Sequence, residues 1–138
     1  MGAGILFEKG GRVLLLKRAR LGDKWQGYWN CPGGSQEKGE TRYETALRET
    51  CEEIGFLPPS FKIYNHIETR AYTLFLAQVD YLFTPRLNDE SSEWEWVRLQ
   101  DIYSYRLHPK DRAPLSIYMR KREPKPALPP RPIAPPKP

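Results

Sequence analysis

The chain has 138 residues, of which 39% are hydrophobic and 28% charged, with a formal net charge of +5. This length and composition indicate one globular domain, and the basic charge suits an anionic ligand as well as ordinary solubility. No apolar run approaches the roughly 20 residues of a membrane span, and the N-terminus lacks the pattern of a signal peptide. Two cysteines, Cys31 and Cys51, are too few for a disulfide scaffold, so we expect a reduced, cytoplasmic protein that does not enter membranes.

The first eighteen residues predict a β-hairpin. Residues 2–9 and 12–18 are rich in apolar side chains, and a Gly-Gly pair separates them. Three consecutive leucines in the second segment predict a central strand that is buried on both faces. Arg18 lies where the chain leaves this strand, so it is a candidate for binding a substrate phosphate, although a solvated turn fits equally well.

Residues 21–32 predict a loop with several aromatic side chains, among them Trp25, Tyr28 and Trp29. An aromatic ring beside a phosphate site can stack on a nucleobase, which stabilises binding by roughly 1–3 kcal/mol for each base. We therefore consider Trp25 and Tyr28 as substrate-binding candidates.

Residues 41–55 predict an amphipathic helix. Thr41 and Glu44 have the spacing of a capping box, and Gly55 is the residue type expected just after a helix ends. At about 100° per residue, one stripe that should face the core contains Tyr43, Leu47, Thr50 and Ile54. The opposite side should contain three carboxylates, those of Glu49, Glu52 and Glu53.

These carboxylates repel one another unless something neutralises them. A divalent cation would turn the repulsion into chelation, and oxygen ligands suit hard ions such as Mg²⁺ or Mn²⁺. The same pattern also fits a solvated acidic face on which Arg48 pairs with Glu52 or Glu44.

The helix belongs to a longer motif that resembles the Nudix (MutT) signature, G-x5-E-x7-R-E-U-x-E-E-x-G-U, in which U is bulky and apolar. Eight of nine specified positions fit, and the nine are Gly34, Glu40, Arg48, Glu49, Thr50, Glu52, Glu53, Gly55 and Phe56. Thr50 departs from the pattern, because the family usually has an aliphatic residue there, and we expect slightly poorer packing. The segment from Trp29 to Gly34 is similar to the W-x-x-P-G-G that precedes the box, in which the Trp packs in the core.

The resemblance implies an α/β fold, the Nudix-type α/β/α sandwich with a mixed β-sheet, over residues 2–121. It implies an enzyme that uses Mg²⁺ or Mn²⁺ and cleaves a pyrophosphate bond in a nucleoside-diphosphate-linked substrate by attack of water at phosphorus. By position, Glu52 and Glu53 would hold the metal, and Glu49 would be a metal ligand or the general base. The backbone carbonyl of Gly33 would be a further ligand.

Two other box residues have implied roles around this centre. Glu40 would make a peripheral contact to the metal or to water. Arg48 would orient the glutamates by ion pairing.

The second half of the chain predicts three more strands, over residues 61–69, 72–83 and 94–99. The polar loop before the last strand, residues 87–93, contains Glu90 and Glu93. Many Nudix enzymes take a further carboxylate from a loop at this place, as a metal ligand or a general base. Spacing alone does not choose between Glu90 and Glu93, and an acidic surface turn fits as well.

Residues 99–121 predict a closing helical region that is interrupted at Pro109 and restarted by Asp111, with Pro114 in its first turn. Leu115, Tyr118 and Met119 would pack onto the sheet, on the side opposite the box helix.

Family sorting rules favour one substrate class. ADP-ribose hydrolases tend to have Pro at the position of Ala71, and dinucleoside-polyphosphate hydrolases tend to have Tyr at the position of Tyr72. Tyr72 is therefore a substrate-binding candidate, and the preferred substrate is a dinucleoside polyphosphate or the 5′ end of RNA. A MutT-like pyrophosphatase of canonical or oxidised nucleoside triphosphates is the alternative. A non-catalytic nucleotide- or RNA-binding Nudix module is an alternative of another class.

The predicted domain covers residues 1–122, and residues 123–138 predict a disordered tail in which eight of sixteen residues are Pro. The tail contains a weak match to ligands of aromatic-lined Pro-binding grooves, so a partner protein and a solvated tail both fit. We expect a monomer or a homodimer that acts on a nucleotide-type small molecule.

Overall fold

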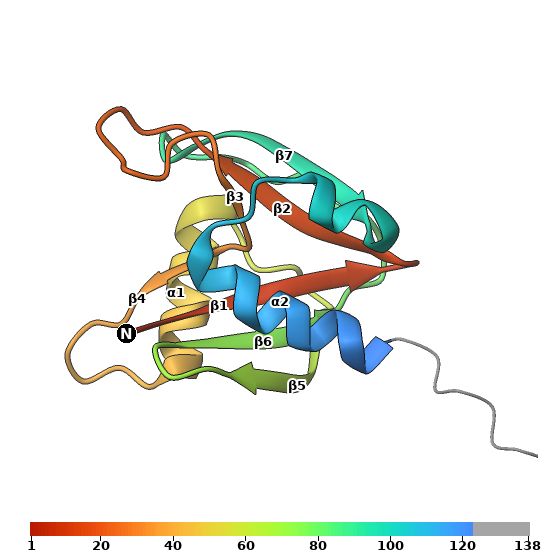
Figure 1. The fold of residues 1–138 in the computed structure, drawn as a ribbon. Coiled ribbons are helices and arrows are strands. Elements are labelled where there is room, and N and C mark those ends of the chain that lie inside the picture. Colours follow the sequence, from red (N-terminus) through yellow and green to blue (C-terminus); the bar gives the residue numbers. More distant parts are fainter. Residues whose placement is uncertain (123–138) are drawn as a thin grey trace, which may run out of the picture.

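The computed structural model describes residues 1–122, which form a mixed β-sheet with a helix on each face (Figure 1). The strands are β1 (Gly2–Lys9), β2 (Arg12–Arg18), β3 (Trp29–Asn30), β4 (Gly33–Ser35), β5 (Lys62–Glu68), β6 (Tyr72–Gln78) and β7 (Ser91–Arg98). The helices are α1 (Arg42–Ile54), the 3₁₀ helix η1 (Leu99–Ser104) and α2 (Pro109–Arg122). The predicted Pro-rich tail lies outside the described residues. Within residues 1–122, no helix is both long and apolar enough to cross a membrane.

Strands β1 and β2 form the predicted hairpin and then diverge. They pair at two positions beside the turn, Glu8 with Val13 and Lys9 with Arg12. Beyond these pairs, β1 runs parallel to β6 and antiparallel to β4, whereas β2 runs antiparallel to β7 and β3. The two groups of strands therefore spread apart from the shared hairpin, as Figure 1 shows. The N-terminal end of β1 and the C-terminal end of β2 lie at the open side.

Each face of the sheet buries its own apolar cluster. The cluster beneath α2 includes Leu6, Leu15, Leu74, Leu76, Leu115 and Tyr118. The cluster beneath α1 includes Ile5, Phe7, Leu14, Ala46 and Ile54. The alternation of side chains along each strand divides them between the two faces. The arrangement confirms the predicted α/β/α sandwich, including the packing of Leu115, Tyr118 and Met119 against the sheet.

Helix α1 has the predicted termini. The Thr41 hydroxyl accepts the Glu44 N–H at 3.1 Å, and the Glu44 carboxylate accepts the Thr41 N–H at 2.9 Å, which completes the capping box. Gly55 ends the helix with φ of 84°, a left-handed conformation in which a Cβ atom would be strained.

Two predicted strands have different bounds in the structure. β6 ends at Gln78, five residues before the predicted end, because its partner β1 supplies no ladder position beyond Glu8. β7 begins at Ser91, three residues before the predicted start, because its pairing with β2 extends to Arg18. The short strand β3 lies within residues 21–32, which were predicted to be a loop, and β4 follows that segment.

The prediction for α2 is wrong at its start. Pro109 begins the helix, as Pro can because the first turn needs no N–H donor at that position, and does not interrupt one. The ring Nδ1 of His108 accepts the Lys110 N–H at 3.0 Å and so caps this end. Asp111 is a fully buried residue of the first turn, and Pro114 lies inside the helix.

Candidate active site

A pocket of about 730 Å³ lies beside the diverging ends of β1 and β2. This volume is typical of a site for a nucleotide-sized ligand. The box contributes Gly33, Gly34, Ser35, Glu49 and Glu53 to its wall. Other segments contribute Arg18, Arg20, Asn30, Tyr72, Glu90, His108 and Lys110. Acidic and basic side chains therefore face one space.

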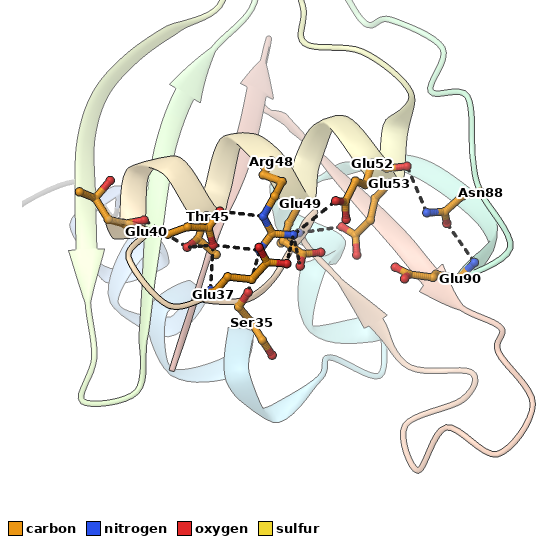
Figure 2. A network of polar contacts seen from close by, with 12 residues as sticks. Ser35, Glu37, Glu40, Thr45, Arg48, Glu49, Glu52, Glu53, Asn88 and Glu90 are labelled. Carbon is orange, nitrogen blue, oxygen red and sulfur yellow. Dashed lines mark hydrogen bonds and ion pairs between the residues drawn. The ribbon is translucent and has the colours of Figure 1, made fainter.

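Arg48 connects the acidic residues of the box (Figure 2). Its guanidinium donates to both carboxylate oxygens of Glu40, at 2.7 and 3.0 Å, and to Glu49 at 3.0 Å. A longer contact of 3.4 Å reaches Glu52, and the Ser35 carbonyl accepts a further hydrogen bond at 3.0 Å. The rigid guanidinium donates in several directions at once, so it fixes the carboxylates relative to the loop before α1.

Glu40 has its carboxylate fully engaged within this network. Besides the Arg48 pair, it accepts the Thr45 hydroxyl at 3.0 Å and the Glu37 N–H at 2.8 Å. The hydrogen bond from Arg48 is the main cause that lowers the pKa of Glu40 to about 2. These contacts place Glu40 as the anchor of Arg48, and the carboxylate does not line the pocket where a peripheral metal contact was predicted.

Glu53 lies on the buried side of α1, so the prediction that it faces away from the core is wrong. It is 5% exposed, whereas Tyr43, which was predicted to face the core, is 45% exposed. The carboxylate accepts the Gly33 N–H at 2.7 Å, because the last turns of α1 lie against β4. Burial is the main cause that raises the pKa of Glu53 to about 8; the Gly33 N–H and the charge of Lys110 lower this pKa, and the charges of Glu90 and Glu49 raise it.

Glu49 approaches the backbone of β4 so closely that a side chain on Gly34 would collide with it. A Cβ atom on Gly34 would lie 2.8 Å from one Glu49 carboxylate oxygen and closer still to the rest of the group. Burial raises the pKa of Glu49, partly offset by Arg48. A side chain at Gly34 would therefore displace this carboxylate, which faces the pocket.

The end of α1 also positions the loop before β7. The Glu52 side chain is 54% exposed and lies outside the pocket wall, but the Glu52 carbonyl accepts the Asn88 side-chain amide at 3.1 Å. Asn88 in turn accepts the Glu90 N–H at 2.9 Å (Figure 2). This link holds Glu90 beside the pocket, where its carboxylate is 3.3 Å from Arg20. The role of Asn88 had no sequence signal, because its hydrogen bond to Glu52 joins segments that are far apart in the chain.

The structure places Glu90 and Glu93, the two acidic candidates from residues 87–93, in different surroundings. Glu93 lies within β7, where its 57% exposed side chain pairs with Lys17 at 3.0 Å, away from the pocket. Glu90 precedes the strand and lines the pocket. The register of β7 on β2 therefore brings Glu90, and not Glu93, to the box carboxylates.

The aromatic candidates of the 21–32 loop lie beside the pocket and do not form its wall. Trp25 packs edge-on against Tyr28 and also contacts His108, with ring centroids 5.1 Å apart in both cases. The Tyr28 ring lies 4.4 Å from the Arg106 guanidinium. Trp29 packs against the cluster beneath α2, which confirms its predicted packing role.

The remaining substrate-binding candidates do line the pocket. Arg18 donates from Nε to Asp23 at 2.6 Å, so its charge is already partly neutralised. Tyr72 is 4% exposed, and its hydroxyl lies in the chain interior without a hydrogen-bond partner. His108 and Lys110, which the sequence did not single out, stand at the start of α2 and complete this side of the pocket.

Comparison with known families decides the assignment. The family profile described as the NUDIX domain matches residues 2–119. The chain belongs to the Nudix family. Among the signature residues of this Nudix domain, Arg48 contacts Glu40, Glu49 and Glu52, whereas Gly34, Glu49 and Glu53 line the pocket.

Its relatives span several named activities. A Mycobacterium tuberculosis protein named for 8-oxo-dGTP diphosphatase activity is 29% identical over 121 residues, which are 78% of this chain and 56% of the relative. The chain thus spans little more than half the length of that relative. The Klebsiella pneumoniae nucleoside triphosphatase NudI is 28% identical over 127 residues, which cover 80% of this chain and 90% of NudI.

Solved structures share the fold. The Nudix hydrolase RenU of M. smegmatis superposes with a TM-score of 0.75 at 25% identity, and the match covers 87% of this chain and 83% of RenU. An Ap4A hydrolase of C. elegans gives a TM-score of 0.70 at 21% identity over 88% of this chain and 97% of that one, which is a likeness of fold alone.

The chemistry of the pocket fits a hard divalent cation. As the side chains stand, residues 1–122 bring no group of three or more Asp, Glu, His or Cys side chains close enough to hold a metal. Glu49, Glu53 and Glu90 nevertheless face one pocket, and their mutual repulsion disfavours the charged form of Glu53. A cation among these oxygens would remove that repulsion, and oxygen-only donors suit Mg²⁺ or Mn²⁺.

Proposed function

We propose that this Nudix domain hydrolyses a pyrophosphate bond in a nucleoside-diphosphate-linked substrate, with Mg²⁺ or Mn²⁺ as cofactor. The observation that carries the proposal is the convergence of Glu49, Glu53 and Glu90 on one pocket that also contains Arg18, Arg20 and Lys110. The basic side chains can bind the anionic phosphates of a substrate, and the acidic side chains can bind a divalent metal ion.

Glu53 and Glu90 would hold the cation, with the Gly33 carbonyl as a further oxygen donor, and Glu49 lines the same pocket as the general base. Bound there, Mg²⁺ or Mn²⁺ supplies charge neutralisation for the phosphates and lowers the pKa of the attacking water. Glu52, at the rim, would join only after a change of rotamer. The sequence left open whether Glu90 or Glu93 is the further carboxylate of the site, and we assign this role to Glu90.

The chain's own residues have distinct duties. Glu49 accepts the proton of the attacking water, a role supported by its raised pKa and its position on the pocket wall. Arg48 holds Glu49 in place through the ion pair at 3.0 Å. Lys110 and Arg18, which line the same pocket, bind the phosphates. The oxygen of water forms the new bond to phosphorus, and the bond to the bridging oxygen breaks.

A nucleoside triphosphate, or the triphosphate end of RNA, is the substrate class that we favour. Preference for a dinucleoside polyphosphate depended on Tyr72, whose ring is buried and so offers no open face for a second base. The name of the M. tuberculosis relative also supports a nucleoside triphosphate. The free thiols of Cys31 and Cys51 support a cytoplasmic location.

The test is nucleotide and phosphate release across a panel that holds ATP, GTP, 8-oxo-dGTP, diadenosine tetraphosphate, triphosphate-ended RNA and ADP-ribose, each with Mg²⁺ or Mn²⁺. We expect turnover of one class, with a loss on the order of 10²–10⁴-fold in Glu49→Gln, as for removal of a general base. Glu93→Gln serves as the matched control and should retain activity. Nucleotide binding without turnover of any panel member would instead support a non-catalytic binding module.

A further inference from the structure

Arg20 connects a carboxylate inside the pocket with one outside it. Its Nη2 atom donates to the Glu90 carboxylate at 3.3 Å and to the Asp89 carboxylate at 3.2 Å. Arg20 and Glu90 line the pocket, whereas Asp89 does not, and the Asp89 side chain is 85% exposed. One guanidinium therefore stands at the rim, against the acidic group that the sequence left open as a candidate.

The backbone holds Arg20 next to Glu90. The β2–β7 ladder changes its register just before Arg18, which pairs with Ser91. Bulges of this kind redirect the side chains that follow and are frequent beside active sites. Directly after Arg18, the Ala19 N–H donates to the Glu90 carbonyl at 2.9 Å. The contact between the two side chains is therefore set by the fold of both segments.

Glu90 is also tied to the end of α1 (Figure 2). Asn88 accepts the Glu90 N–H at 2.9 Å, and its side-chain amide donates to the Glu52 carbonyl at 3.1 Å. The backbone of Glu90 is thus held from α1 on one side and from β2 on the other. A change in the partner of the Glu90 carboxylate is therefore a movement of side chains, with the backbone in place.

Two positive groups compete for the Glu90 carboxylate. One is the Arg20 guanidinium, which donates to it at 3.3 Å. The other is the divalent cation for which Glu90 is a proposed ligand. A guanidinium so close to a divalent cation is repelled by it, and an oxygen that ligates the cation is a poorer acceptor for Arg20. Arg20 therefore leaves Glu90 when the cation binds.

Arg20 has the donors to bind a phosphate once it leaves Glu90. Its hydrogen bonds to residues 1–122 both use Nη2, so Nε and Nη1 keep N–H groups for another acceptor. The planar guanidinium matches the geometry of two phosphate oxygens. The side chain is 55% exposed, which leaves it room to turn into the pocket. Arg18, by contrast, is already paired with Asp23 at 2.6 Å.

We propose that Arg20 couples metal binding to phosphate binding, an inference that rests on the proposed role of Glu90 as a metal ligand. Without a cation, Arg20 neutralises Glu90 and so reduces the repulsion among the carboxylates of the pocket. With a cation at Glu90, Arg20 turns to the phosphates of the substrate. Each ligand favours the other, because both draw Arg20 away from the same carboxylate, and linkage makes this effect reciprocal.

The first test is calorimetric binding of Mn²⁺ to the full 138-residue chain without nucleotide. We expect Arg20→Gln to bind Mn²⁺ roughly two- to fivefold more tightly than the wild type, because the loss of a partly exposed ion pair frees Glu90. The direction of the change is decisive. A residue that only held Glu90 in place would weaken Mn²⁺ binding when replaced, and weaker or unchanged binding would overturn the proposal.

A double-mutant cycle separates the ion pair from the charge of Arg20 alone. In a Glu90→Gln background, Arg20→Gln should no longer tighten Mn²⁺ binding. A gain of equal size in both backgrounds would assign the effect to the net charge of the pocket and refute the coupling. Arg98→Gln is the matched control and should bind Mn²⁺ as the wild type does, since Arg98 is similarly exposed and pairs with Asp101 at 2.8 Å.

The second test measures the coupling with methylenediphosphonate, a non-hydrolysable analogue of pyrophosphate. Its affinity is determined in EDTA and again in saturating Mg²⁺, and the ratio of the two affinities is compared between variants. Arg20→Gln should lower this ratio by roughly two- to fivefold, the factor by which it tightens Mn²⁺ binding, because linkage requires the two effects to agree. Equal ratios in the wild type and Arg20→Gln would contradict the proposal.

The outcomes distinguish this inference from the proposed function. Mn²⁺ and methylenediphosphonate binding that depends on Arg20, in a protein that hydrolyses nothing in the panel, would retain the coupling and remove the hydrolase. Turnover of a panel substrate by a protein whose Mn²⁺ affinity is the same with Arg20 and with Gln at this position would do the reverse.

Discussion

Replacing Thr50 with valine should stabilise the protein. Thr50 is fully buried on α1, between Ala46 and Ile54 of the cluster beneath that helix, and its hydroxyl has no hydrogen-bond partner. Valine has nearly the same shape and a similar helix propensity, so the substitution removes the unpaired hydroxyl and changes little else. This is also the one signature position at which the chain departs from the usual aliphatic residue.

The magnitude follows from the penalty of an unpaired buried hydroxyl. Mutational data place that penalty at roughly 1–3 kcal/mol, and we expect a gain of about 1–2 kcal/mol in the free energy of unfolding. For a domain of this size the gain corresponds to a rise of about 3–8 °C in Tm. Urea denaturation should show a higher midpoint with an unchanged slope, which separates a change in stability from a change in compactness.

Thr45→Val is the matched control on the same helix. Thr45 is equally buried, but its hydroxyl contacts the Glu40 carboxylate at 3.0 Å and the Thr41 carbonyl at 3.1 Å. Its loss should destabilise the protein by about 1–2 kcal/mol, opposite in sign to Thr50→Val. A neutral or destabilising Thr50→Val variant with an unchanged slope would refute the reasoning, because the hydroxyl would then have a partner such as a buried water.

Three further outcomes are expected. Glu90→Gln should reduce Mg²⁺-dependent turnover by at least tenfold and weaken the apparent affinity for Mg²⁺. Glu93→Gln should match the wild type. Equal effects of the two substitutions in a Mg²⁺ titration would contradict the proposed metal-binding role of Glu90. Arg48→Lys should lower metal affinity or activity by roughly 10–100-fold, because an ammonium cannot replace the forked contacts of the guanidinium. A variant whose Mg²⁺ titration matches that of the wild type would count against the orienting role of Arg48. Burial raises the pKa of Asp111 from its usual 3.8 to about 6, so between these values the folded state holds a proton that the unfolded state has lost. Stability should therefore fall as pH rises through this window, by at most roughly 1.4 kcal/mol per pH unit. Asp111→Asn should make that slope shallower in urea melts between pH 4.5 and 6.5, and the part that remains belongs to Glu53, whose pKa is also raised. Asp101→Asn, at an exposed carboxylate on η1, should keep the full slope, and an unchanged slope in Asp111→Asn would assign it to other groups.

The sequence alone determined those features that depend on neighbours in the chain. The ends of α1 follow from a capping box within four residues and a glycine that accepts a left-handed backbone. The β1–β2 hairpin follows from two apolar segments around a Gly-Gly turn. The family followed from the spacing of charged residues over one helix, because a helix converts fixed spacing into a fixed arrangement in space.

Tertiary structure determined the contacts between segments that are far apart in the chain. The register of β7 on β2 chose Glu90 over Glu93, and the end of β1 set the end of β6. The contact of α1 with β4 buried Glu53, although helical periodicity alone had placed it with the exposed carboxylates.

The unpaired oxygens of Asn30, Tyr72 and Asp111 have the same origin. Each residue lies in a different part of the chain, and none has a local signal that predicts its burial without a partner. Periodicity and capping act through hydrogen bonds and side-chain contacts within one element, whereas the environment of a polar group in the interior depends on which elements pack around it. The sequence could therefore identify the Nudix motif, and only the packing of β3, β6 and α2 decides which polar groups are buried without a hydrogen-bond partner.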